Sequence, residues 1–238
     1  MSNRKQVQFI SYLALYTAMY VVLKYVGNLI PFLAMPNGGS IELELIAVCL
    51  ASYHLKWKGG AAVALLSWLI TIVLGFPMYF VHPVQIALDY VLPLLAIGLS
   101  SLHLHYLELS SKSQGVISAA RAVFLFAGIL LSFGYSAVTL IAALVLSAAT
   151  FVISYYYIKR KRFFGIIPAF FAKYLFTVIS GAYFWAEGAA AGSREAWAFS
   201  LSYNLGYNLV SMIVCTIVVP LLWDRIRLVT KMQTEKKD

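Results

Sequence analysis

Long apolar stretches, separated by short polar or basic connections, run along almost the whole chain. A transmembrane helix needs about 20 mostly apolar residues. The pattern therefore predicts eight helical segments, at about 7–30, 41–56, 59–75, 84–107, 115–133, 135–158, 163–185 and 197–223. Gly59 and Gly60 separate the second segment weakly from the third, and a tight turn near Gly134 joins the fifth to the sixth. The chain is predicted to be an all-α polytopic membrane protein.

The basic residues predict how these segments are oriented. They gather at the N-terminus, near residues 56–58, 112–121 and 159–162, and in the segment 224–238. The alternate connections, 31–40, 76–83, around 134 and 186–196, hold one basic residue, Arg194. Cytoplasmic connections are enriched in Lys and Arg. The pattern predicts eight spans with both termini inside and a cytoplasmic tail at 224–238.

Composition agrees with this architecture. Hydrophobic residues make up 62% of the chain and charged residues 11%, whereas soluble domains carry about 25% charged residues. The net charge of +9 is accounted for by the inner connections, so no nucleic-acid partner is expected. With no evident linker, residues 1–238 are interpreted as a single transmembrane domain.

The stretch HPVQIALDYVLPLLAIG, residues 82–98, contains an acid inside an apolar span. An ionised carboxylate in hydrocarbon costs about 3 kcal/mol on insertion scales, so Asp89 is a candidate functional residue. Gln85 lies one helical turn before it and shares its face. Two interpretations remain open: Asp89 faces a ligand, or it pairs with Lys173, another charge inside a span.

Polar and aromatic residues gather on the predicted outer side. The connection MPNGGS (35–40) contains two adjacent glycines, which let the backbone approach a ligand or cap a helix, and Glu42 and Glu44 follow it. These acids either begin a helix or face a pocket. The other outer candidates are Tyr79, His82, Tyr90, Trp185, Trp197, Tyr203, Asn204 and Asn208. Any single aromatic residue among them could also belong to an interfacial belt.

Enzyme signatures are missing from the sequence. It has no HExxH, GxSxG or Walker A motif, and its histidines and cysteines lack metal-ligand spacing. Cys49 and Cys215 lie in apolar runs and are interpreted as small buried hydrophobic residues. No catalytic activity, cofactor or metal is expected, and a transporter of this kind needs an ion gradient or a partner ATPase.

Several pieces of sequence resemble the thiamine-specific S components of energy-coupling factor (ECF) vitamin transporters. They are MPNGGS (35–40), Trp68, GFPMYFVHPVQIALDYVLPLLAIGL (75–99), KYLFTVISGAYFW (173–185) and SLSYN (200–204). The resemblance covers most of 7–107 and 163–223, and implies an S-component-like helical bundle of six spans. Residues of about 112–160 then form an inserted two-helix hairpin, interpreted as peripheral or lipid-facing packing, or else as a regulatory or partner-binding element.

The resemblance also implies a ligand site near the outer face. Its implied contacts, with Gln85 added because it shares the face of Asp89, are Trp68, Tyr79, Gln85, Asp89, Tyr90, Thr177, Trp185, Phe199 and Asn204. Asp89 would pair with the cationic thiazolium of thiamine, and aromatic faces would add cation–π attraction. Thr177 and Phe199 replace a histidine and a tyrosine usual in the family. A related ligand, such as a pyrimidine or thiazole precursor, therefore remains an alternative.

The partners of such an S component follow from the same resemblance. Ala14 and Ala18 form a small-xxx-small pattern that would contact the shared ECF transmembrane subunit, which works with two ATPase subunits. Lipid of a prokaryotic cytoplasmic membrane would surround the protein. An ion-coupled secondary transporter that uses Asp89 and Lys173 as a charge pair is the alternative from another class.

Overall fold

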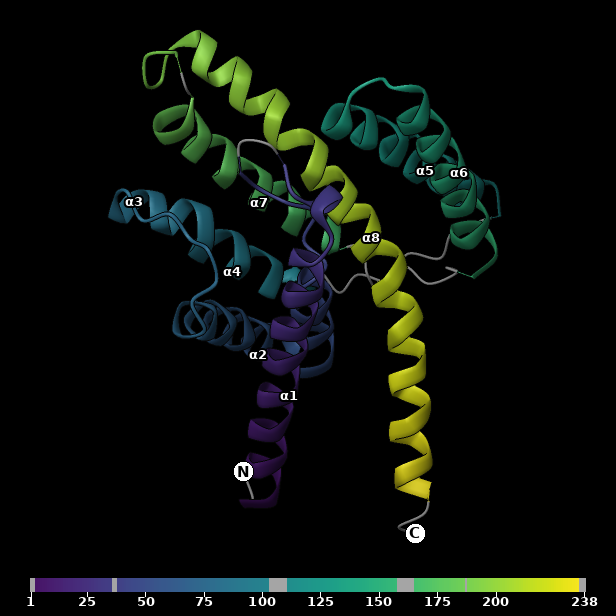
Figure 1. The fold of residues 1–238 in the computed structure, drawn as a ribbon. Coiled ribbons are helices and arrows are strands. Elements are labelled where there is room, and N and C mark those ends of the chain that lie inside the picture. The colour runs from purple at the N-terminus through teal and green to yellow at the C-terminus, as the bar shows by residue number, and fades with distance from the viewer. Residues whose placement is uncertain (1–2, 36–37, 103–110, 158–164, 187, 236–238) are drawn as a thin grey trace.

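The computed structural model describes residues 3–35, 38–102, 111–157, 165–186 and 188–235 (Figure 1). Helices dominate these residues, and an isolated bridge between Ala34 and Ser40 is their only β pairing. The helices are α1 (Asn3–Asn28), α2 (Leu45–Val73), α3 (Pro83–Ile86), α4 (Leu92–Gly98), α5 (Ser111–Phe133), α6 (Ala137–Tyr157), α7 (Ile166–Ser180) and α8 (Arg194–Glu235). A π-helical segment, Ala87–Val91, joins α3 to α4, and another, Gly181–Trp185, extends α7.

Seven helical stretches of the described chain are long and apolar enough to cross a membrane. This finding confirms the predicted all-α polytopic architecture. The count differs from eight because the predicted segments 41–56 and 59–75 both lie in α2.

The helix α2 is interrupted at Lys56, whose φ of 64° and ψ of 175° are not helical. A Cβ built on Gly60 would lie 2.6 Å from the Cβ of Ser52, whereas residues eight apart in a straight helix are about 12 Å apart. The chain therefore turns sharply at Lys56, and both predicted segments exist as halves of one element.

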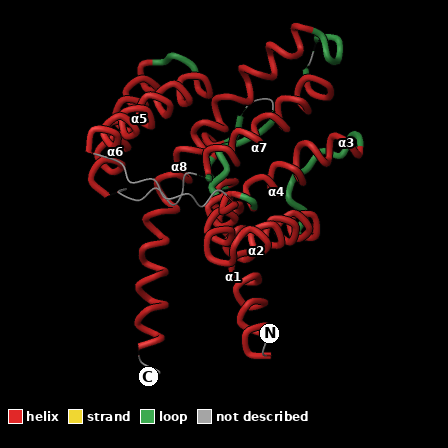
Figure 2. The backbone as a smooth tube through the Cα atoms, turned by 180° about the vertical axis from the view of Figure 1, so that it is seen from behind, coloured by secondary structure: helices red, strands yellow, loops and turns green. Residues whose placement is uncertain are grey.

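Both termini lie at the same end of the molecule (Figure 1). The turns at 134–136 and 188–193 lie at the opposite end (Figure 2). That both termini share one side of the membrane remains a prediction. The last helix differs from its predicted range of 197–223, because α8 continues to Glu235 through most of the predicted tail.

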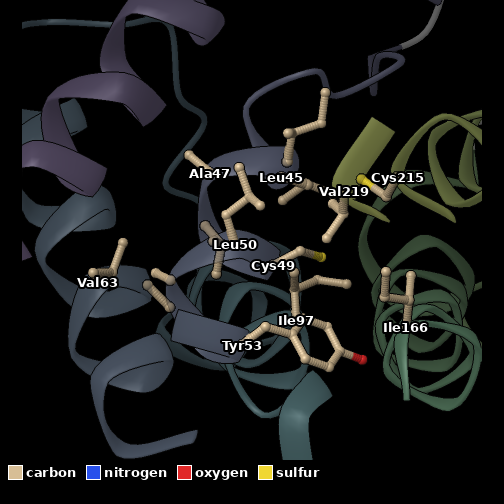
Figure 3. Packing of buried hydrophobic residues seen from close by; sticks show 14 of the residues in the cluster. Leu45, Ala47, Cys49, Leu50, Tyr53, Val63, Ile97, Ile166, Cys215 and Val219 are labelled. Atoms are coloured by element: carbon tan, nitrogen blue, oxygen red, sulfur yellow. The ribbon is translucent and has the colours of Figure 1, made fainter. Parts of the chain in front are cut away.

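The main hydrophobic core surrounds the first half of α2, which is buried from Leu45 to Tyr53. Figure 3 shows Leu50 and Cys49 of α2 facing side chains of α4, α7 and α8. Cys49 and Cys215 are free and buried there, as predicted. A Cβ on Gly98 would lie 2.7 Å from the carbonyl oxygen of Gly60. The backbones of α2 and α4 therefore touch at these two glycines.

The predicted hairpin is present as α5 and α6, at one side of the bundle beside α8 (Figure 1). A Cβ on Gly128 of α5 would lie 3.2 Å from the carbonyl oxygen of Gly206 in α8, so the two helices cross closely. The outward side chains of α6 are apolar and exposed, among them Val138, Ile141, Leu144 and Val145. This surface suits contact with lipid. That the hairpin is an insertion remains a prediction.

Candidate functional site

The carboxylate of Asp89 is held by two neutral donors from different parts of the chain. Gln85 Nε2 donates to Asp89 Oδ2 at 2.6 Å, which confirms that the two side chains share a face. Trp185 Nε1 donates to the same oxygen at 2.8 Å, from the end of the π-helical extension of α7. Asp89 itself lies in the π-helical segment between α3 and α4. Such π segments occur frequently at functional sites.

Two tyrosines complete the group around Asp89. The rings of Tyr79 and Trp185 lie 5.9 Å apart, edge to face. The backbone N–H of Tyr79 donates to the hydroxyl oxygen of Tyr90 at 2.9 Å. We name Tyr79, Gln85, Asp89, Tyr90 and Trp185 the Asp89 cluster. Five of the predicted site residues therefore lie together.

Gln85 anchors this cluster. Its side chain is fully buried, and its Oε1 accepts a hydrogen bond from the backbone N–H of Val81 at 3.2 Å. One amide thus fixes both the carboxylate of Asp89 and the connection that carries Tyr79. The exposed fraction of Tyr79 is 67%, so this side of the cluster is open.

Lys173 pairs with Glu42. This contact bears on the alternative, left open by the sequence, that Lys173 pairs with Asp89. Its Nζ lies 2.5 Å from Glu42 Oε2 and donates to Asn208 Oδ1 at 2.8 Å. The same ammonium lies 5.4 Å from the centre of the Tyr207 ring. Because Lys173 is buried and has an acid partner, the proposed pair with Asp89 is not formed.

Thr177 and Asn204 belong to the polar contact between α7 and α8. Asn204 Nδ2 donates to the carbonyl oxygen and the hydroxyl of Ser200, at 2.9 and 3.0 Å, and its Oδ1 accepts from the Tyr207 hydroxyl. Thr177 Oγ1 donates to the carbonyl oxygen of Tyr174 at 2.9 Å. Asn208 Nδ2 lies 3.5 Å from Thr177 Oγ1. We name Glu42, Lys173, Thr177, Asn204, Tyr207 and Asn208 the Lys173 network.

Residues 38–42 lie against this network. Gly38 and Gly39 have φ angles of 91° and 77°, which favour glycine. A Cβ on Gly39 would lie 3.0 Å from the Tyr207 ring, and the Tyr203 hydroxyl donates to the carbonyl oxygen of Gly38 at 2.7 Å. The backbone at Gly39 therefore lies close to α8, whereas the sequence predicted its approach to a ligand or a helix cap.

Glu44 forms a second ion pair two residues after Glu42. Its Oε1 accepts from Lys24 Nζ of α1 at 2.9 Å, and Glu44 is buried. Glu42 thus holds this part of the chain against α7, and Glu44 holds it against α1. Neither pair was predicted, although two acids spaced by one residue and two lysines within apolar segments were visible in the sequence.

Comparison with known proteins identifies the family. The thiamine transporter protein family (Thia_YuaJ) matches residues 10–230. The chain belongs to the thiamine transporter family. It is 30% identical over 227 residues to the thiamine transporter ThiT of Bacillus subtilis (strain 168), a match that covers 94% of each chain. No solved structure matches it.

Membership in the thiamine transporter family identifies the chain as a transport protein rather than an enzyme. With seven helices able to span a bilayer, it is a multi-pass protein of the cell membrane. Among the described residues, no three His, Cys, Asp or Glu side chains gather to hold a metal ion.

Two further residues that were predicted to contact the ligand of this thiamine transporter family member, Phe199 and Trp68, make their described contacts outside the Asp89 cluster. Phe199 is 38% exposed, and its ring stacks on Tyr203 at 5.4 Å. Trp68 of α2 packs against the main core, and its indole N–H is buried without a hydrogen-bond partner in the described part of the chain. No described hydrogen bond or ring contact joins either residue to the Asp89 cluster. Their roles in binding remain predictions.

The predicted partner contact lies on the open face of α1. Ala14 and Ala18 are both exposed, and Val22 is 58% exposed on the same face. A stripe of small side chains four residues apart lets another helix approach closely. The face is therefore accessible to a second subunit.

Proposed function

We propose that this member of the thiamine transporter family binds thiamine at the Asp89 cluster, in an outward-facing pocket, as the substrate-binding subunit of an ATP-driven importer. The observation that carries the proposal is the environment of Asp89. Within the described residues its carboxylate contacts two neutral N–H groups and no cation. A carboxylate within a span, oriented but not neutralised, attracts a cationic ligand.

Thiamine has the matching chemistry. Its thiazolium ring is a permanent cation, and its pyrimidine ring is flat and aromatic. Asp89 would pair with the cation, while Tyr79 and Trp185 lie beside that carboxylate and offer ring faces. Each cation–π contact of this kind contributes about 0.5–2 kcal/mol. The amide of Asn204 could donate to and accept from a pyrimidine edge if it exchanged its present partners, Ser200 and Tyr207, for the ligand.

The energy for transport would come from partner subunits. We propose that the exposed Ala14–Ala18 stripe of α1 contacts a shared ECF transmembrane subunit, which couples this chain to two ATPases. An ion-coupled mechanism based on an Asp89–Lys173 pair is disfavoured, because Lys173 is paired with Glu42.

Binding is tested by titrating detergent-purified protein with thiamine and recording tryptophan fluorescence. Trp185 contacts Asp89, so occupation of the cluster should quench its emission saturably. Quenching by a pyrimidine or thiazole precursor, without quenching by thiamine, would assign a related ligand. Thr177 and Phe199 motivate that alternative, because both replace groups usual in the family.

Coupling is tested separately by uptake of labelled thiamine into cells. Cells that express this chain with the ECF transmembrane subunit and both ATPases should accumulate thiamine, whereas cells without the ATPases should not. Ala14→Leu with Ala18→Leu should abolish uptake and leave binding intact, because larger side chains prevent close helix contact. Uptake that needs a proton or sodium gradient, and no ATPase, would contradict the proposed coupling.

A further inference from the structure

The hairpin formed by α5 and α6 contains a cation that the transport site does not use. Arg121 lies on α5, and its Nη1 donates to Ser154 Oγ of α6 at 2.6 Å. Ser118 Oγ donates to the same hydroxyl at 3.1 Å. Ser118 and Ser154 are both fully buried. The seam between the two helices is therefore polar, although their outer faces are apolar.

Arg121 differs from the other cations within the spans. Lys24 and Lys173 each pair with a glutamate, whereas Arg121 contacts only the hydroxyl of Ser154 in the described part of the chain. A guanidinium carries five N–H donors, so most of its donors are available. An intramembrane charge without an opposite charge is costly, and such a residue commonly marks a functional contact.

The side chain of Arg121 extends toward the end of the hairpin that lies opposite its turn. Arg121 is 12 residues before the end of α5 at Phe133, whereas Ser154 is 17 residues after the start of α6 at Ala137. At about 1.5 Å per residue, the guanidinium is displaced by roughly 7 Å away from the turn. The turn lies opposite the two termini (Figure 2). Arg121 therefore points toward the side of the termini, which is predicted to be cytoplasmic.

Long basic side chains within a membrane extend in this way to reach the headgroup region. Gln114 lies farther along the seam toward the same end, where its Nε2 donates to the carbonyl oxygen of Tyr155 at 2.7 Å. Lys112, close to the start of α5, is exposed. The seam thus leads from Arg121 to a basic end of the hairpin, and its chemistry favours an anion.

We propose that the α5–α6 seam binds the phosphate of an anionic phospholipid from the cytoplasmic leaflet, with Arg121 as the principal ligand. The fork of a guanidinium matches two phosphate oxygens. Basic sites between transmembrane helices on the cytoplasmic side bind anionic headgroups in this manner. The lipid supplies the negative charge that Arg121 lacks within the protein. This proposal is independent of the ligand of the Asp89 cluster.

The test uses the full-length protein, delipidated in detergent. Binding of phosphatidylglycerol and of phosphatidylcholine is measured by native mass spectrometry for wild type, Arg121→Gln and Arg225→Gln. Arg225 is an exposed arginine of α8 outside the seam, so Arg225→Gln removes the same charge elsewhere. Wild type and Arg225→Gln should prefer phosphatidylglycerol about fivefold, and Arg121→Gln should lose that preference.

Equal preferences in Arg121→Gln and Arg225→Gln would overturn the proposal, as would a wild type without any preference. Displacement of phosphatidylglycerol by millimolar inorganic phosphate would show that the seam takes a soluble anion, and would also overturn it. If Arg121→Gln does not fold, Arg121→Lys replaces it, because lysine keeps the charge without the two-pronged contact. The preference of Arg121→Lys for phosphatidylglycerol over phosphatidylcholine should fall clearly below that of wild type. An unchanged preference would contradict the assignment of Arg121 as the phosphate ligand.

Discussion

Two carboxylates of the helical bundle, Glu42 and Asp89, have opposite environments. Glu42 contacts Lys173 at 2.5 Å, and the lysine is further bound by Asn208. Asp89 instead accepts hydrogen bonds from the neutral side chains of Gln85 and Trp185. Both acids are oriented by neighbours, but only the charge of Glu42 is balanced within the described protein.

This difference distinguishes an acid that stabilises the fold from an acid that is available to bind a cationic ligand. Neutral N–H donors fix the direction of a carboxylate and leave its net charge in place. A lysine removes that charge and fastens the segments that carry the pair. We therefore propose that Glu42 holds residues 38–44 on the bundle, and that Asp89 meets a cation that arrives with the ligand.

The largest expected effect is on the stability of the folded state, and it is expected at the ion pair of Lys173 and Glu42. Lys173→Met should lower the free energy of unfolding by about 3–5 kcal/mol, because it leaves Glu42 as an unpaired charge in a partly buried position. Unfolding by dodecyl sulfate, followed by circular dichroism, measures this change. The double variant Lys173→Met with Glu42→Gln should recover most of the loss. A single variant as stable as wild type would show that the pair has no structural role.

The next largest effect is expected on thiamine binding, at Asp89, whose charge no described residue balances. Asp89→Asn should weaken thiamine by about 2–5 kcal/mol, the cost of losing a buried charge partner. Its stability should change little, because asparagine still accepts from Gln85 and Trp185. Calorimetric titration measures the affinity. Glu195→Gln, an exposed acid at the start of α8, serves as the matched control and should bind thiamine normally.

A smaller effect is expected at Gln85, which positions Asp89. Gln85→Met removes one hydrogen bond to the carboxylate and the acceptor for Val81 N–H. Thiamine binding should weaken by about 1–2 kcal/mol, since each lost hydrogen bond of this kind has that order of effect. Gln114→Met, in the hairpin seam, is the control and should leave thiamine affinity unchanged. Tighter binding in Gln85→Met would mean that the amide competes with the ligand for Asp89.

The smallest expected effect is at Thr177, where the sequence departs from the pattern of the resembling family. Thr177→His should tighten thiamine by about 1 kcal/mol, because an imidazole adds a hydrogen-bonding edge. The same titration measures the change, with Thr139→His, near the start of α6, as control. A loss of thiamine binding would indicate a site shaped for a different ligand.

The sequence predicted the parts of this architecture that depend on local pattern. Apolar length located every helical segment, and the spacing of Gln85 and Asp89 placed both side chains on one face, where they are hydrogen-bonded. Each of these features follows from residues within a few positions of one another.

The remaining features depend on contacts between distant segments. Trp185 meets Asp89 across 96 positions of sequence, and no periodicity in either segment specifies that meeting. From the sequence, Asp89 was the predicted alternative partner of Lys173, whereas the packing of the chain places Lys173 against Glu42. The sequence does not reveal the sharp turn at Lys56, because lysine rarely adopts a positive φ, and it indicates a boundary at Gly59 and Gly60 instead.

The central claim is that Asp89 receives the positive charge of thiamine. The most direct test is a cycle of four affinities: wild type and Asp89→Asn, each titrated with thiamine and with a neutral deaza analogue in which thiophene replaces the thiazolium. Wild type should prefer the cation, and Asp89→Asn should lose about 2 kcal/mol or more of that preference while binding the neutral analogue normally. An equal preference in both proteins would contradict the account, because the charge of the ligand would then be recognised elsewhere.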